Sequence, residues 1–139
     1  MTLDFFVPPG VPVLTGVTHE GRNSLAAFTL FAKVFYRLAE TPDELGGYNR
    51  TSELVSTTVG PGYFVAYPQG PTEVLVDYLR PPPRAPEGWP PILRNDERLS
   101  RFVYNGTQDL LRGVSSHVSI GRASRAGKVM DNWFVLCRT

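Results

Sequence analysis

Hydrophobic and polar residues alternate most clearly between residues 72 and 79, where Val74, Val76 and Tyr78 occupy every second position. The acidic residues Glu73 and Asp77 fall on the alternate positions, and this period of two predicts a strand with one buried face and one solvent-exposed face. Residues 62–67 predict a preceding strand. The proline- and glycine-containing segment that joins the two predicts the turn of a hairpin.

The segment from 25 to 38 follows a different spacing, in which apolar residues recur three and four positions apart. This spacing predicts a helix that packs one face against the core. Asn23 or Ser24 is suited to cap its beginning. Thr41 and Pro42 are expected to end it, because a residue before proline is displaced from the helical conformation. The aromatic and β-branched content of the same segment also fits a strand, and both assignments stay open at this point.

The remaining chain is expected to add short elements, with residues 11–22 irregular or extended. They are strands over 3–7, 52–59, 115–122 and 129–138, and a second helix over 96–104 that restarts between Thr107 and Leu111. Helices mixed with hairpin-linked strands predict a single α+β domain over residues 1–139. Its sheet is expected to be mostly antiparallel, with about five to six strands and two helices. A chain of 139 residues is long enough to bury one such core.

Residues 80–91 interrupt these elements with six prolines in twelve positions, so they are expected to form a stiff arm or loop. Chain ends and segments of this kind are ordered where contacts hold them. We expect neighbouring subunits to supply those contacts. The sequence therefore favours a structural or assembly subunit of a larger homo- or hetero-oligomer, such as a component of a virus or phage particle.

Charge supports association with protein rather than with nucleic acid. The net charge is +1, which creates no overall field toward nucleic acid or membrane. Residues 1–93 carry six basic and nine acidic side chains, whereas residues 94–139 carry eight and four. Complementary patches of this kind favour self-association or contact with other protein subunits, and phosphate contacts by the basic cluster are the alternative. The expected interface residues are Tyr78, Arg80, Pro82, Trp89, Arg122, Arg125 and Lys128.

The densest cluster of catalytic residue types is His19, Glu20 and Arg22. Histidine is a common general base, glutamate can orient it, and arginine can hold an anion, although the same residues are also typical of a solvated loop. These three would act in the alternative function, a small cyclase- or isomerase-like enzyme or a small-molecule-binding domain. Its aromatic-lined pocket would lie between the sheet and the first helix, with the three residues at its mouth. A ribonuclease-like toxin that pairs His19 and Glu20 with C-terminal basic residues is a third hypothesis.

Recognisable cofactor, metal and nucleotide motifs are absent from the sequence. The glycines lack the spacing of phosphate-binding loops, and the single cysteine, Cys137, excludes an intrachain disulfide and a cysteine-based zinc site. No signal peptide is recognisable, and no apolar run approaches the roughly 18 residues of a membrane span. The expected location is therefore the cytoplasm or a virion.

Overall fold

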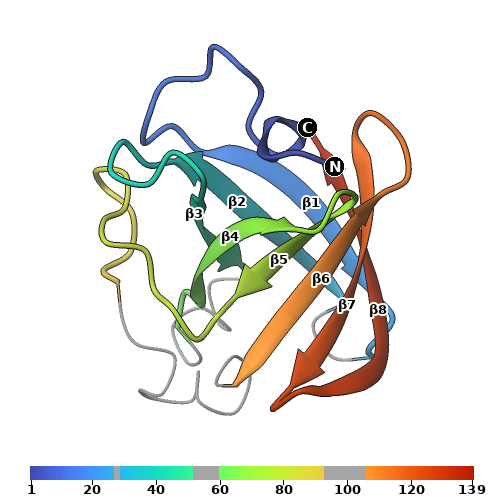
Figure 1. The fold of residues 1–139 in the computed structure, drawn as a ribbon. Helices are drawn as coiled ribbons and strands as arrows, with labels where there is room; N and C mark the ends of the chain where they lie inside the picture. Colours follow the sequence, from blue (N-terminus) through green and yellow to red (C-terminus); the bar gives the residue numbers. More distant parts are fainter. Residues whose placement is uncertain (27–28, 52–59, 93–105) are drawn as a thin grey trace.

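The computed structural model describes residues 1–26, 29–51, 60–92 and 106–139, which form a closed barrel of eight antiparallel strands (Figure 1). Each strand pairs with the next one along the chain, and the last strand pairs with the first. A three-residue 3-10 helix, η1 (Leu3–Phe5), precedes the barrel. The strands are β1 (Val17–Asn23), β2 (Leu30–Arg37), β3 (Leu45–Arg50), β4 (Tyr63–Gln69), β5 (Glu73–Asp77), β6 (Thr107–Gly113), β7 (Val118–Arg125) and β8 (Lys128–Arg138).

The predicted α+β class with two helices is wrong, because the described residues form a barrel of strands with η1 as the one helical element. The segment from 25 to 38 contains β2 instead of the first helix. Both faces of β2 are covered, since Phe35 points into the barrel and Tyr36 points outward beneath the proline-rich segment. A strand buried on both faces is apolar at nearly every position, and its periodicity cannot be told from that of a buried helix.

Some of the other predicted strands and helices are confirmed, and others are wrong. The hairpin of β4 and β5 is confirmed, and the two C-terminal strands are confirmed as β7 and β8. The strand predicted over 3–7 is wrong, because η1 occupies that segment, and the helical restart after Thr107 is wrong, because β6 begins there. The strand predicted over 52–59 and the helix predicted over 96–104 lie outside the described residues.

Apolar side chains fill the centre of the barrel, where two glycines make room for aromatic rings. A Cβ atom on Gly47 of β3 would overlap the ring of Phe64, and a Cβ on Gly121 of β7 would overlap the ring of Phe134. Eight strands enclose an interior just wide enough for packed side chains or for one small ligand. The glycines therefore let Phe64 and Phe134 cross the interior.

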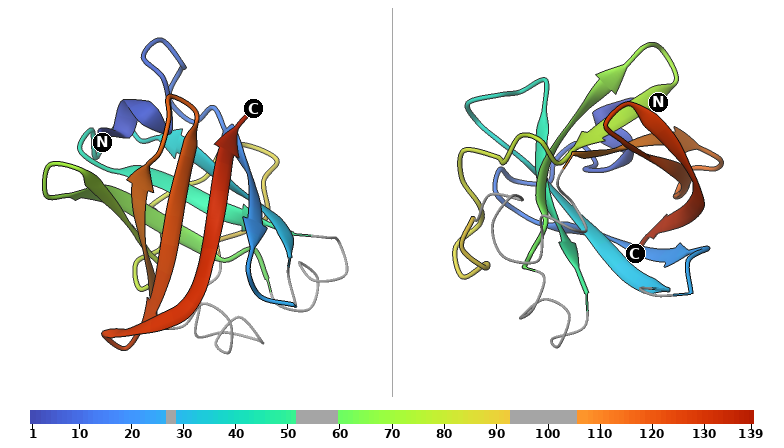
Figure 2. Two further views of the ribbon diagram at one scale, coloured as in Figure 1. Left: turned by 90° about the vertical axis from the view of Figure 1, so that its right-hand side faces the viewer. Right: turned by 90° about the horizontal axis from the view of Figure 1, so that it is seen from below.

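The N-terminal segment closes one end of the barrel, the end at which both chain termini lie (Figure 1, Figure 2). Phe6 and Val7 are fully buried and belong to the same hydrophobic core as Phe35. The Phe6 ring lies 4.6 Å from that of Phe35 and 5.4 Å from that of His19, measured between centroids. We call Phe6 and Val7 the plug, because they fill this end of the interior.

The proline-rich segment lies beside β3 on the outside of the barrel (Figure 1). The Trp89 ring packs edge-on against Tyr36, with 5.2 Å between centroids. The hydroxyls of Tyr36 and Tyr63 donate hydrogen bonds to the backbone carbonyls of Arg84 and Pro90 at 2.6 and 2.5 Å. Contacts within its own chain therefore hold this segment against the barrel, and association with neighbouring subunits stays a prediction.

Candidate ligand-binding pocket

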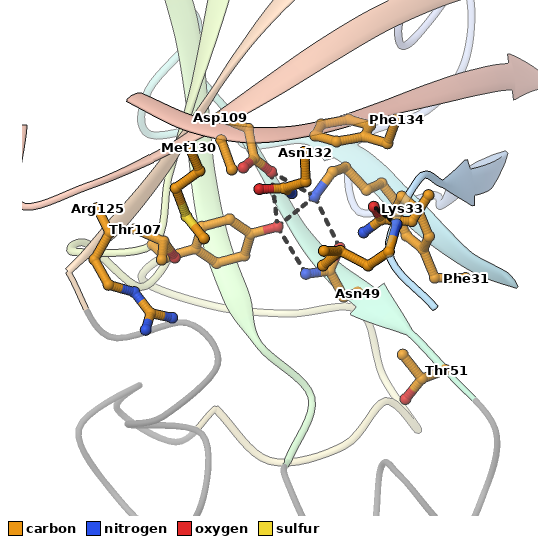
Figure 3. Close-up of a pocket in the computed structure, with 14 residues that line it drawn as sticks. Phe31, Lys33, Asn49, Thr51, Thr107, Asp109, Arg125, Met130, Asn132 and Phe134 are labelled. Carbon is orange, nitrogen blue, oxygen red and sulfur yellow. Dashed lines mark hydrogen bonds and ion pairs between the residues drawn. The ribbon is translucent and has the colours of Figure 1, made fainter. Parts of the chain in front are cut away.

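A pocket of about 260 Å³ lies inside the barrel (Figure 3). Its described lining comes from β1, β2, β3, β6, β7 and β8, from residues just after β1 and β3, and from Tyr78, which directly follows β5. For comparison, an engineered apolar protein cavity of roughly 150 Å³ binds benzene. This pocket is therefore large enough for a substituted ring or a short branched chain. Asp109 and Lys33 lie on its inner side, and Arg125 and Thr51 lie farther out (Figure 3).

Apolar side chains make up much of the pocket wall. Phe31 of β2 and Phe134 of β8 meet edge to face, with 5.7 Å between ring centroids. Met130 and Ala123 add apolar surface from β8 and β7. A ligand that entered this space would exchange water for aromatic and aliphatic contacts, which is the main source of affinity in small-molecule sites.

Four polar side chains form a closed hydrogen-bond network at the inner side of the pocket. Lys33 Nζ lies 2.9 Å from Asp109 Oδ2, donates to Asn49 Oδ1 at 3.0 Å and also donates to the Tyr78 hydroxyl. The Tyr78 hydroxyl accepts a hydrogen bond from Asn49 Nδ2 at 2.7 Å and donates to Asp109 Oδ2 at 3.3 Å. Each of the four residues is at most 5% exposed. The network joins one cation to one anion, so its formal charge is zero.

Burial lowers the pKa of Lys33, and the carboxylate of Asp109 opposes that shift. The ammonium is also surrounded by aromatic rings with centroids 5.0 to 5.6 Å from Nζ, those of Phe31, Phe64, Tyr78 and Phe134. Ring faces attract cations, and the attraction grows when both groups are shielded from water. All three ammonium hydrogens have acceptors in the network, so the nitrogen offers no lone pair while these contacts persist.

Unused hydrogen-bonding capacity remains next to this network. Asn132 of β8 is 9% exposed and lines the pocket, yet its side chain forms no hydrogen bond with any of the described residues. Both interactions of Asp109 within the described chain involve Oδ2, which leaves Oδ1 without a hydrogen bond there. These groups are donors and acceptors available to a bound molecule.

The strand separates the residues of the predicted catalytic cluster. His19, Glu20 and Arg22 all lie on β1, where successive side chains point to opposite sides of the strand. His19 is buried, and its Nε2 donates to the Phe6 carbonyl at 2.9 Å, next to the plug. Glu20 is exposed and pairs with Arg50 on β3 at 3.0 Å, and Arg22 is exposed as well. None of the three predicted catalytic residues lines the pocket.

The predicted interface residues divide between the inside and the outside of the barrel. Tyr78 belongs to the buried network, and Arg125 lines the pocket. Pro82 is buried within the proline-rich segment, and Trp89 covers Tyr36.

The other three predicted interface residues are outside the pocket. Arg80 pairs with Glu44 at 3.0 Å. Arg122 lies over the Trp133 ring, with its guanidinium carbon 4.9 Å from the centroid, and Lys128 is exposed at the start of β8. The seven residues therefore do not share one face, and an interface through any subset of them stays a prediction.

Sequence reasoning missed the polar residues that define the pocket. Lys33 did carry a signal, because it interrupts an otherwise apolar run, and a charge in such a run is expected to be paired when it is buried. Asn49, Asp109 and Asn132 carried none, because polar residues at those positions are ordinary in strands with one wet face.

Comparison of the chain with protein-family models, with curated proteins and with solved structures finds no match. Within the described residues, no group of three or more histidine, cysteine, aspartate or glutamate side chains is placed to hold a metal ion. No helix in that part of the chain has the length and apolar character to cross a membrane.

Proposed function

We propose that this protein binds a small, largely apolar molecule inside its barrel. The observation that carries the proposal is the pocket of about 260 Å³ with aromatic walls and a buried polar network at its inner side. Small-molecule sites are typically apolar cavities with a few placed polar groups. An eight-stranded barrel has the interior dimensions to hold one small ligand.

Binding is favoured over catalysis because the polar groups of the Lys33 network are already paired with one another. Lys33 uses its donors on Asp109, Asn49 and Tyr78, and these contacts stabilise it as a paired cation. The one histidine inside the barrel, His19, faces the plug and lies outside the pocket lining. The described lining of the pocket therefore offers hydrogen bonds and apolar contact, and its one lysine is held as a paired cation rather than as a free amine.

The test uses an environment-sensitive apolar dye and variants that fill the cavity. Ala123→Phe places a ring in the pocket, and Met130→Trp fills it from β8. Ile120→Phe is the matched control, because Ile120 lies on β7 and is 37% exposed. We expect saturable binding of one dye per chain in the wild type and in the control, and loss of binding in both filled variants.

Far-UV circular dichroism verifies that each variant is folded. Dye binding that is unchanged in folded Ala123→Phe and Met130→Trp would contradict the proposal.

A second candidate function is association of this chain with other subunits, as the sequence suggested, in the cytoplasm or in a virion. The observation in its favour is an apolar patch on the outside of β7 and β8, where Ile120, Trp133 and Val135 are 37 to 47% exposed. Aromatic and aliphatic side chains are common at the centre of protein interfaces. Sedimentation velocity tests it, and a monomer at tens of micromolar in the presence of the natural partners would count against it.

A further inference from the structure

The pocket contains hydrogen-bonding groups that the described residues leave unused. Asn132 is nine-tenths buried and has no side-chain partner among the described residues, and Asp109 Oδ1 likewise accepts no hydrogen bond there. Both residues line the pocket, and neither is among the described residues with a fully buried, unpaired side-chain atom, so their open atoms are reached from the pocket space. Two open polar groups in one cavity point to a ligand that completes their hydrogen bonds.

The strand register brings the two groups to the same region of the pocket. Asp109 of β6 is directly opposite Ala123 of β7, and the pairing of β7 with β8 is irregular between Arg122 and Ser124, at the level of Asn132. The residue between the two polar side chains is thus an alanine, which leaves space above it. Figure 3 shows Asn132 on the inner side of the pocket, beside Asp109 and the other residues of the Lys33 network.

The charge of the site restricts the ligand. Lys33 already neutralises Asp109 at 2.9 Å. A carboxylate bound here would face the free oxygen of Asp109, and an ammonium would add a second cation beside Lys33. At the inner end either ion would lose its hydration without gaining an opposite charge of its own, because Arg125, the other cation of the described lining, lies farther out (Figure 3).

We propose that the pocket selects a neutral, ring-sized apolar molecule with a hydroxyl group at its inner end, which donates to Asp109 Oδ1 and accepts from Asn132 Nδ2. This inference rests on the proposed binding function. A hydroxyl supplies one donor and one acceptor, which matches the two open groups. The rest of the ligand lies against Phe31, Phe134 and Met130, which supply no comparable polar group. A site built to hydrogen-bond a hydroxyl rejects the analogue that lacks it, because its own polar groups then stay unpaired.

The test compares three ligands of similar shape by displacement of the same apolar dye and by calorimetry. They are para-ethylphenol, its methyl analogue para-ethyltoluene and its carboxylate analogue para-ethylbenzoate. We expect the phenol to bind the wild type at least about tenfold more tightly than either analogue, since tenfold corresponds to 1.4 kcal/mol and a hydrogen bond to a charged group exceeds that.

The variant that removes the proposed contact is Asn132→Leu, which keeps the size of the side chain. We expect it to reduce the preference for phenol over toluene to about threefold or less, because one of the two hydrogen bonds is lost. Asp131→Leu is the matched control, because its side chain is fully exposed on the same strand, and we expect it to keep the wild-type preference. The Asn132 side-chain amide signal in a ¹⁵N correlation spectrum provides a readout without mutation. It should shift with the phenol and not with the toluene.

Three outcomes decide the proposal. A phenol preference that falls in Asn132→Leu and persists in Asp131→Leu supports it. Equal binding of phenol and toluene, or an Asn132 amide signal that the phenol does not shift, overturns the hydroxyl selection and leaves the binding function in place. A wild type that binds neither the dye nor any of the three ligands overturns the binding function and this inference together.

Discussion

At the end of the barrel that holds both chain termini, Phe6 and Val7 fill the interior and are completely buried, whereas at the opposite end Lys33 and Asp109 are buried around a cavity of about 260 Å³. The plug end gains stability from apolar burial and from dispersion contacts in a packed interior. The pocket end removes two charges from water and leaves space unfilled, and both features oppose stability. Within one continuous barrel, the plug end therefore serves the fold, and the pocket end has the features of a site kept for a ligand.

The largest expected effect lies at the pocket end, in Lys33→Met. It leaves the Asp109 carboxylate buried without its cation, and we expect a loss of about 4 kcal/mol in the free energy of unfolding. The double variant Lys33→Met with Asp109→Leu should recover most of that loss, because both charges are then absent. Urea unfolding followed by circular dichroism measures each value. A single variant that loses less than about 1 kcal/mol would show that the ion pair is not held as described.

At the plug end we expect Phe6→Ala to destabilise the protein by about 3 kcal/mol, because it removes a fully buried ring next to Phe35 and His19. The loss should be smaller than for Lys33→Met, since the N-terminal segment can detach locally. Dye affinity at the pocket should stay unchanged, and urea unfolding combined with dye titration tests both statements. A clear loss of dye affinity in folded protein would contradict the independence of the two ends.

Acid should weaken the plug end through His19. Burial lowers its pKa from 6.5 to about 4, partly offset by the hydrogen bond to Phe6 and reinforced by Arg138. The unfolded chain therefore binds this proton at a higher pH than the folded chain does. The contribution to stability is present above pH 6.5, decreases as the pH falls, and is fully lost below about 4.

Between pH 7 and pH 5 we expect His19 to remove about 2 kcal/mol of stability. Urea unfolding at the two pH values measures the change. His19→Gln should remove this part of the pH dependence, whereas His117→Gln should keep it, because His117 is exposed. Equal pH dependence in both variants would show that His19 is not the group responsible.

The smallest expected effect on stability is that of Asn132→Leu, within about 0.5 kcal/mol of the wild type or slightly stabilising. The side chain has no hydrogen-bond partner among the described residues, so an apolar replacement breaks none there. Thermal unfolding measures this value. A loss above about 1 kcal/mol would mean that Asn132 supports the fold rather than a ligand.

The success of sequence reasoning depended on how each strand is covered. β5 has alternating polar and apolar residues, and its hairpin with β4 was predicted correctly. The pattern of β2 fitted both a helix and a strand, because the plug and the proline-rich segment bury both of its faces. The proline-rich segment that covers the outer face lies about 50 positions away in the sequence, so no local pattern can reveal this burial.

The candidate site was less accessible to prediction than the fold. The three residues of the predicted catalytic cluster are neighbours in sequence, but the strand turns His19 inward and turns Glu20 and Arg22 outward. Lys33 and Asp109 are separated by most of the chain, and only the closed order of the strands brings them within 2.9 Å. Adjacency in sequence therefore suggested a cluster that the strand separates, and distance in sequence concealed the pocket.

Local chemistry was enough to establish the β4–β5 hairpin and the last two strands, because each depends on residues close together in the chain. Closure of the barrel, the plug, the covered outer face of β2 and the Lys33 network depend on pairings between distant strands. Such pairings are selected by the burial of the whole interior rather than by any segment alone, which is why the tertiary structure was needed to find the pocket.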